Sequence, residues 1–448
     1  MLTLPAAARP LLLALTDPLI QPTAQRLLLL AVGAILTTGR RTVTRILATM
    51  GPLAQGHFSD YHRVFSRASW STWAVGKGLA RLALDLLPPD EPVVVAGDDT
   101  VAQHRGKHVY GKGRHRDAVR SSHAHTVWKW GHKGVTLAIL VPLPFVRRRW
   151  ALPVLSVLYR PEDLNRAEGR RHRTPPALVR QLVAVLVHWF PRRQFVLVAD
   201  GTFATHELAR FCRRHRRHVP FVSRFYAAAN RYDPPPAYRG KGRPRVKGAK
   251  RPAPREVVAA RKRLRRALVR WYGGQPRRIG YVSATGHWYK AGAGLVPVRW
   301  VFVRDRQGTH RDEYFFTTDP SLPPEVIVSW YTQRWGIETT YQELRAHLGF
   351  ETTRQRVAAS VLRTGPCLLG LFSVISLIYA AHLRDHHPKL QSLSWYAKGE
   401  PTFADALATV RRLFGGETIF ADSAEHAGFA KLPADLRETL LNCLCPAA

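Results

Sequence analysis

The sequence predicts a mixed α/β fold that is preceded by helices and interrupted by a β-rich insertion. Two β-branched runs, residues 92–100 (PVVVAGDDT) and 194–203 (QFVLVADGTF), read as buried strands that end on acidic residues. With the segments between them they give the order β-β-β-α-β, which is typical of a mixed α/β layout. The chain has 448 residues, roughly two to three times a typical domain length. We therefore expect one core with appendages or insertions.

Residues 1–88 are expected to form a helical N-terminal DNA-binding domain. Leucine-rich segments alternate with breaks from about residue 22, and the last segment ends at Pro88 and Pro89. This pattern is typical of a bundle of short helices. A basic bundle before a larger core could read a DNA end, although a domain that only packs against the core fits the same pattern.

Residues 89–210 are assigned to the first part of the core. After the strand at 92–100, the segments at 125–144 and 150–161 read as further strands, and a helix is expected from 175 to 189. The strand at 194–203 follows. Acids therefore fall at the ends of the first and fourth predicted strands.

Residues 211–322 are assigned to a β-rich insertion, because four segments that alternate apolar and polar residues are expected as strands: 278–284, 287–291, 295–305 and 312–319. Its first part, 233–255, is a basic loop of proline, glycine and cations that cannot bury enough surface to order itself. Within it, KGRPR at 241–245 resembles the core of a minor-groove AT-hook, which makes Lys241, Arg243 and Arg245 candidate DNA contacts. Trp288 and Trp300 could stack on an unpaired base, but strand core is the favoured interpretation.

The composition favours nucleic acid as the partner. Lys and Arg number 68 against 31 Asp and Glu, which leaves a net charge of +37. Four cysteines show no paired zinc spacing and indicate reduced thiols in the cytoplasm. The longest apolar run, 367–381, is shorter than the roughly 20 residues of a membrane span, so we expect a buried helix and no membrane partner.

The most informative segment is a helix predicted over residues 324–350. At about 100° per residue, Tyr331, Arg334, Glu338 and Arg345 fall within roughly 60° of one another around the axis. This face combines a hydroxyl, a carboxylate and two guanidinium groups, which suits a phosphate and a metal together. Glu343 points about 120° away from Tyr331, so Glu338 is the candidate catalytic acid of this helix. Residues 323–385 are assigned to this helix and the end of the core, and 386–448 to a C-terminal region.

Three carboxylates from separate elements can converge on one point. Asp98 or Asp99, Asp200 and Glu338 would repel one another unless a cation lay among them, and hard divalent cations with oxygen ligands are the common solution. Two such ions about 4 Å apart would activate a water or a 3′-hydroxyl for in-line displacement at phosphorus. A structural interpretation stays open, because strand-end Asp residues often cap a turn and a helical Glu often pairs with a nearby Arg.

These residues resemble the DDE transposases of bacterial insertion sequences, the cut-and-paste group with a Tyr-x2-Arg-x3-Glu-x6-Lys signature. Tyr331, Arg334 and Glu338 match it, and Arg345 stands in place of the Lys. The resemblance covers most of the chain and implies a ribonuclease H-like catalytic core. It also implies Mg²⁺ or Mn²⁺, two ions held by Asp98, Asp200 and Glu338, and cleavage with strand transfer at terminal inverted repeats. Double-stranded transposon ends and target DNA would be the partners of a homodimer in a synaptic complex.

The resemblance assigns phosphate contacts to Tyr331, Arg334 and Arg345. Asp98 is chosen as the first metal ligand because Asp-Gly-Thr at 200–202 matches the first position of Asp-Asp-Thr at 98–100, and Asp99 remains an alternative. In the histidine-rich segment 104–128, phosphate contacts by Lys107, Lys112, Arg114 and Arg116 are favoured over a zinc site. A repair or junction endonuclease, or a non-catalytic DNA-binding descendant, are the alternative functions.

Overall fold

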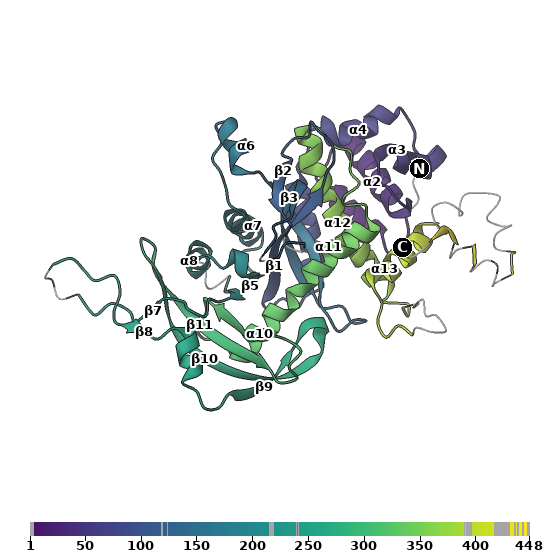
Figure 1. The fold of residues 1–448 in the computed structure, drawn as a ribbon. Coiled ribbons are helices and arrows are strands. Elements are labelled where there is room, and N and C mark those ends of the chain that lie inside the picture. The colour runs from purple at the N-terminus through teal and green to yellow at the C-terminus, as the bar shows by residue number, and fades with distance from the viewer. Residues whose placement is uncertain are drawn as a thin grey trace.

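The fold was analysed in a computed structural model, in which helices flank both sides of a long, continuous sheet (Figure 1). The structure describes residues 4–117, 120–122, 124–214, 219–238, 240, 242–388, 390, 397–415, 431–433, 436, 439–440 and 443–445.

Short helices form the N-terminal part of the chain, as predicted. They are α1 (Arg9–Thr16), α2 (Gln21–Leu36), α3 (Val43–Met50), α4 (Phe58–Ser66) and α5 (Thr72–Leu84). Ser71 caps α5 by accepting from the backbone N–H of Trp73 at 3.2 Å. A Cβ added at Gly76 would lie 2.6 Å from the carbonyl oxygen of Val154, so α5 lies directly against the sheet. These helices and the core therefore share one hydrophobic cluster.

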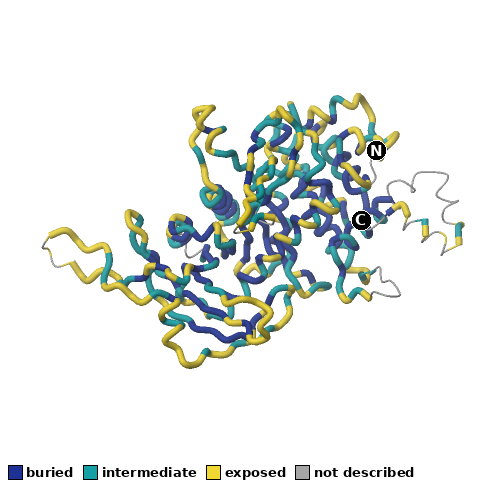
Figure 2. The backbone as a smooth tube through the Cα atoms, in the orientation of Figure 1, coloured by how far each residue is buried: buried dark blue, intermediate teal, exposed yellow. Residues whose placement is uncertain are grey.

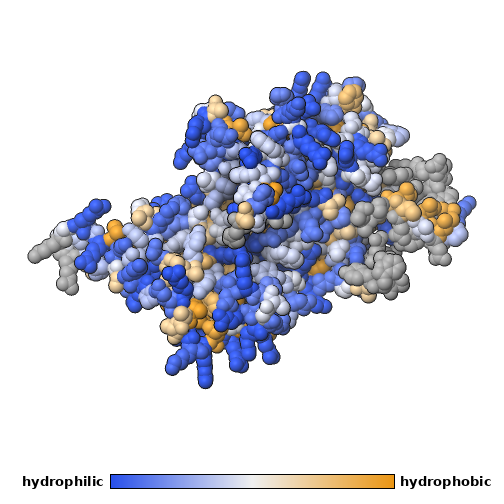
Figure 3. Space-filling model, viewed as in Figure 1, coloured by the Kyte–Doolittle hydropathy of each residue, from blue (hydrophilic) through white to orange (hydrophobic). Residues whose placement is uncertain are grey.

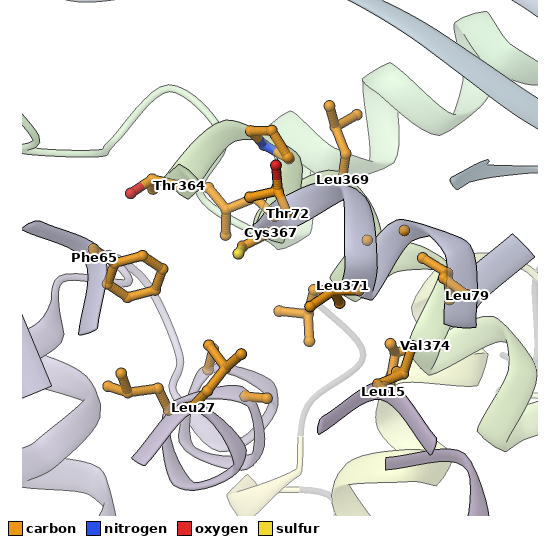
Figure 4. Close-up of a pocket in the computed structure, with 18 of the residues that line it drawn as sticks. Leu15, Leu27, Phe65, Thr72, Leu79, Thr364, Cys367, Leu369, Leu371 and Val374 are labelled. Atoms are coloured by element: carbon orange, nitrogen blue, oxygen red, sulfur yellow. The ribbon is translucent and has the colours of Figure 1, made fainter. Parts of the chain in front are cut away.

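The N-terminal helices enclose an apolar cavity of about 160 Å³ with the C-terminal half of the chain. Figure 4 shows Leu27, Phe65 and Leu79 pointing toward Cys367 and Leu371 of α12 (Ala358–His382). This lining has few polar atoms, so the contact between the two regions is a packing contact.

Twelve strands of the described residues join one mixed sheet. The first half contains β1 (Val93–Gln103), β2 (Gly113–Arg116), β3 (Trp128–Val141), β4 (Trp150–Tyr159) and β5 (Phe195–Ala199). β1 pairs antiparallel with β3 and parallel with β5, and β5 pairs parallel with β6 (Phe221–Arg224). This confirms a mixed α/β fold with a large mixed sheet.

The second half of the sheet continues from β6 through β12 (Glu313–Thr317) into β11 (Gly294–Asp305) and β10 (Pro276–Lys290). Shorter strands complete it: β7 (Arg231–Tyr232), β8 (Lys250–Arg251) and β9 (Arg265–Arg270). Segments 278–284 and 287–291, expected as two strands, form the single strand β10, because β11 pairs with it without interruption from Ile279 to Lys290. The loop between β7 and β8 projects away from the body (Figure 1).

Helices cover the first half of the sheet on both faces. On one face α7 (Pro175–Trp189) packs against β1, β3 and β4, and Gly97 of β1 makes room for Val179 of α7. The short α6 (Glu162–Ala167) precedes α7, and α8 (His206–Arg214) contacts β6, β10 and β11. On the other face α12 and α11 (Trp335–His347) pack against β4. A short helix, α9 (Pro254–Ala259), and the C-terminal α13 (Phe403–Phe414) complete the set. Buried backbone is concentrated where these layers meet (Figure 2).

The predicted buried helix over 367–381 is part of α12, whose inward residues include Phe372, Ile375 and Tyr379. By length and composition α12 could cross a membrane, but 61% of its most apolar window is buried inside the protein, as in a core helix. Hydrophilic side chains cover most of the visible surface (Figure 3).

Two predicted elements differ from the structure in ways that concern the candidate site. The acids of 92–100 do not end a strand, because β1 continues to Gln103 along its antiparallel partner β3. The helix over 324–350 is divided into α10 (Pro324–Gln333) and α11, with Arg334 between them. The N–H of Arg334 bonds to the carbonyl of Tyr331, and the N–H of Ile337 bonds to that of Arg334, so a tighter i→i+3 turn replaces the α-helical pattern there.

Candidate active site

Asp98 and Asp200 lie at neighbouring positions on two parallel strands. β1 and β5 pair in register up to Gly97 and Ala199, and each aspartate is the next residue. β5 ends there, and Asp200 caps the short turn that follows by accepting from the N–H of Thr202 at 2.9 Å. The two carboxylates are close enough that the charge of Asp200 disfavours ionisation of Asp98.

Asp98 faces the helices α10 and α11. Its Oδ2 lies 3.6 Å from a guanidinium nitrogen of Arg334, and another nitrogen of Arg334 donates to Glu338 Oε1 at 2.7 Å. Arg334 therefore bridges two of the predicted acids. Its side chain is 7% exposed, whereas the Glu338 side chain is 47% exposed, so the site opens toward solvent on the Glu338 side.

Asp99 faces the opposite side of the sheet, because successive residues of a strand alternate between faces. It forms an ion pair with Lys133 of β3 at 3.0 Å. This places Asp98, and not Asp99, on the face that carries Arg334 and Glu338. The period-2 pattern alone left the choice open, and the position of α11 distinguishes the two residues.

Burial dominates the electrostatics of the acidic pair. It raises the pKa of Asp98 to about 8, the charges of Asp200 and Asp99 add to this, and the Arg334 guanidinium opposes it. Burial also raises the pKa of Asp99, and its partner Lys133 opposes that shift. The positive charge of Arg334 therefore does not fully offset the cost of burying a negative charge on Asp98. A further cation beside Asp98 would lower the pKa of this residue.

Tyr331 is fully buried beneath this site, which differs from its predicted place on a phosphate-binding face. Its ring centroid lies 4.4 Å from that of Phe315 and 5.5 Å from the guanidinium carbon of Arg334. Arg224 approaches the same ring at 5.9 Å. The Tyr331 side chain is completely buried in this structure, where it contacts Phe315 and two arginines, Arg334 and Arg224.

Arg345 joins α11 to the far part of β1. It donates to the hydroxyl of Thr100, and its Nε donates to Glu351 at 3.3 Å. Glu351 also accepts from Lys129 at 2.8 Å. The Arg345 side chain is 35% exposed, so it can contact a ligand while remaining anchored.

Comparison with known families gives a match to the DDE superfamily endonuclease model over residues 14–278. This is more than half of the chain. The chain belongs to the DDE superfamily of endonucleases. The matched range of this DDE endonuclease includes Asp98 and Asp200 and ends before α11. The position of Glu338 near Asp98 therefore comes from the structure alone, through the shared partner Arg334.

Among solved structures, the DDE endonuclease is similar to a piggyBac transposase synaptic complex with hairpin DNA. The identity is 11%, the match covers 96% of this chain and 77% of the other, and the TM-score is 0.41. No curated protein matches the chain.

The donor chemistry of the DDE endonuclease site fits a hard divalent cation. Asp98, Asp200 and Glu338 offer carboxylate oxygens, and the raised pKa of Asp98 indicates an acid that lacks a full counter-charge. Within the described residues no three acidic, His or Cys side chains are already gathered as a metal cage. Arg334 lies between Asp98 and Glu338, so a bound metal would require Glu338 to exchange this partner.

The other residues predicted to contact DNA or to stack on a base lie in different environments in the DDE endonuclease. Arg243 and Arg245 are exposed in the loop between β7 and β8, and Lys241 lies outside the described residues. Trp300 is 0% and Trp288 8% exposed, which confirms the interpretation of both as strand core. Trp128 and Trp130 are exposed, and their position in a strand does not predict this, because alternation along a strand does not reveal which face is covered.

Proposed function

We propose that this DDE endonuclease is the transposase of an insertion sequence, which cleaves and transfers DNA strands at terminal inverted repeats. The observation that carries the proposal is the arrangement of Asp98 beside Asp200 on neighbouring strands, with the buried Arg334 bridging Asp98 to Glu338 of α11. The family membership and the net charge of +37 support DNA as the substrate. We further propose a ribonuclease H-like core, action in the cytoplasm, and a homodimer that holds two DNA ends.

In this proposal Asp98, Asp200 and Glu338 hold the metal. Bound Mg²⁺ or Mn²⁺ would supply Lewis-acid activation of the attacking water or 3′-hydroxyl and stabilisation of the leaving oxygen. The protein's own residues position the substrate. Arg345, anchored on Thr100 and partly exposed, contacts the phosphodiester, and Arg334 provides a fixed positive charge beside Asp98.

Tyr331 has a supporting role, because it is buried against Phe315 and contacts Arg334. Arg243 and Arg245 contact DNA from the projecting loop, together with Lys241. The short helices of residues 1–88 bind the repeat. The core comprises residues 89–210 and 323–385, the β-rich insertion comprises 211–322, and the C-terminal region comprises 386–448.

The test is cleavage of a labelled duplex that carries the flanking inverted repeat, with Mg²⁺ or Mn²⁺. Glu338→Gln should lower cleavage by about three orders of magnitude while DNA binding persists. Glu343→Gln is the matched control, because Glu343 lies on the same helix but pairs with His347 at 3.1 Å. Its cleavage should stay within about tenfold of the native rate.

Equal cleavage by the native chain and Glu338→Gln would show that Glu338 is not a catalytic residue. Metal-dependent cleavage without preference for the repeat would indicate a repair or junction endonuclease. DNA binding without cleavage by any variant would indicate a non-catalytic descendant.

A further inference from the structure

The ribbon formed by β2 and β3 presents two tryptophans and two arginines on its outer face. Arg114 pairs with Trp130 and Arg116 pairs with Trp128, and cross-strand partners of this kind lie on the same face. All four are exposed, whereas Gly113 and His115, the alternate residues of β2, are buried. Trp128 is 49% and Trp130 55% exposed. We call these four residues the Trp–Arg platform.

The platform is strongly cationic. The Arg114 guanidinium lies 4.6 Å from the ring centroid of Trp128, and the Lys112 ammonium lies 5.5 Å from that of Trp130. An open basin of about 780 Å³ borders both rings, and its lining includes five Lys or Arg residues and two acids. One of these acids, Glu351, already accepts from Lys129 and Arg345. The basin therefore favours a polyanion over an apolar or basic ligand.

The platform lies on the same face of the sheet as Asp98. In β3, Thr136 pairs with Asp98, and Thr136, Trp130 and Trp128 are separated by even numbers of residues. Trp130 is six residues from Thr136, which corresponds to about 20 Å along the strand. Arg345 and Glu351 bridge this interval, because they contact Thr100 and Lys129.

We propose that the Trp–Arg platform binds unpaired nucleotides of a DNA strand that runs away from the cleavage centre. Bases in a duplex are covered by their neighbours on both sides, so a flat, exposed indole on a sheet can stack only on a base that is free on one side. Arg114, Arg116 and Lys112 contact the phosphates between stacked bases. The proposal rests on the proposed function for the position of the cleaved bond, but strand binding itself does not require cleavage.

Binding to a short labelled oligothymidylate and to a fully paired duplex of equal length, followed by fluorescence anisotropy at one stated salt concentration, tests the proposal. We expect Trp130→Ala and Trp128→Ala each to weaken binding of the single strand roughly tenfold. Duplex binding should change less than about threefold, because other cations carry it. Trp130→Phe should restore most of the affinity, since a phenyl ring also stacks.

Tyr226→Ala is the matched control, because Tyr226 is an aromatic residue with 52% exposure that lies just after β6, outside the residues assigned to DNA binding. It should leave single-strand affinity unchanged. Circular dichroism of each variant establishes that it is folded.

Native single-strand affinity in both Trp→Ala variants would overturn the proposal. Equal losses for the single strand and the duplex would also overturn it, because they would describe a general phosphate patch. These outcomes are independent of the cleavage assay. A chain that never cleaves DNA but loses single-strand affinity in Trp130→Ala would contradict the proposed function and support the platform.

Discussion

Two antiparallel ribbons of this protein use the same residue pair in opposite environments. In the ribbon of β10 and β11, Trp300 of β11 is completely buried, and its ring lies 5.2 Å from Arg231 of the adjoining strand β7. In β2 and β3, Arg114 lies 4.6 Å from the ring of Trp128, which is about half exposed. The first pair belongs to the core, and the second is available to a ligand.

The difference arises from what covers each ribbon. The β10–β11 region packs against α8, α9 and α10, and Trp288 adds ring contacts to Phe225 and Phe316. The outer face of β2–β3 keeps its four side chains exposed. Burial by distant elements, and not the local residue pattern, therefore decides whether an Arg–Trp pair stabilises the fold or forms a binding surface.

The largest contrast is expected from truncating one tryptophan of each ribbon. Trp300→Ala should lower the free energy of unfolding by about 3–5 kcal/mol, because it leaves a cavity in the core. Trp130→Ala should change it by less than about 0.5 kcal/mol. Denaturant unfolding of both variants measures the difference. Similar losses in both would show that the β2–β3 ribbon is covered in solution.

A second contrast concerns a buried and a half-exposed arginine. Arg334→Gln should destabilise the fold by about 2–3 kcal/mol, because its buried side chain loses the charged hydrogen bond to Glu338 and its packing on Tyr331. Arg345→Gln should cost less than about 1 kcal/mol, since its contacts are partly exposed. Thermal unfolding at neutral pH compares the two. An equal and small cost would mean that the buried contacts of Arg334 with Glu338 and Tyr331 do not stabilise the fold.

The smallest effect is expected from His115, on the inner side of the β2–β3 ribbon. Burial, with a contribution from Lys133, lowers the pKa of His115 to about 4. The folded state therefore favours the neutral ring. Stability from this residue is complete above the unfolded pKa of about 6.5 and is lost as the pH falls from about 6.5 to about 4.

The loss should be on the order of 1–2 kcal/mol after allowance for solvent screening. His115→Gln should flatten this part of the stability profile, whereas the exposed His57→Gln should not. Denaturant midpoints across this pH range test the point. An unchanged slope in His115→Gln would show that its ring is not a source of acid sensitivity.

Much of the fold follows from local sequence. The runs around Val94 and Val196 form buried strands, and α7 begins at Pro175 and ends at Trp189 as expected, because Thr174 caps its first turn. The predicted end of β1 is too early, because its continuation to Gln103 depends on pairing with residues of β3 that lie about thirty positions further along the chain. The break at Arg334 likewise depends on tertiary contacts of its side chain.

The acids of the site were identifiable, and their surroundings were not. The spacing of Arg334 and Glu338 predicts a shared helix face, and the two residues do bond to each other. Burial of Tyr331 depends on Phe315, which comes from another element, and no spacing within α10 reveals it. The exposure of Trp128 and Trp130 could have been suspected from the arginines at alternate positions in the preceding segment.

Single-turnover cleavage by Asp98→Asn, Asp99→Asn and Asp200→Asn tests the central claim most directly. Each substitution replaces one carboxyl group by an amide, but only Asp98 and Asp200 are assigned to the centre with Glu338. We predict that Asp98→Asn and Asp200→Asn abolish metal-dependent cleavage, and that Asp99→Asn retains it within about tenfold. Full cleavage by Asp98→Asn, or loss in Asp99→Asn equal to that in Asp98→Asn, would contradict the account.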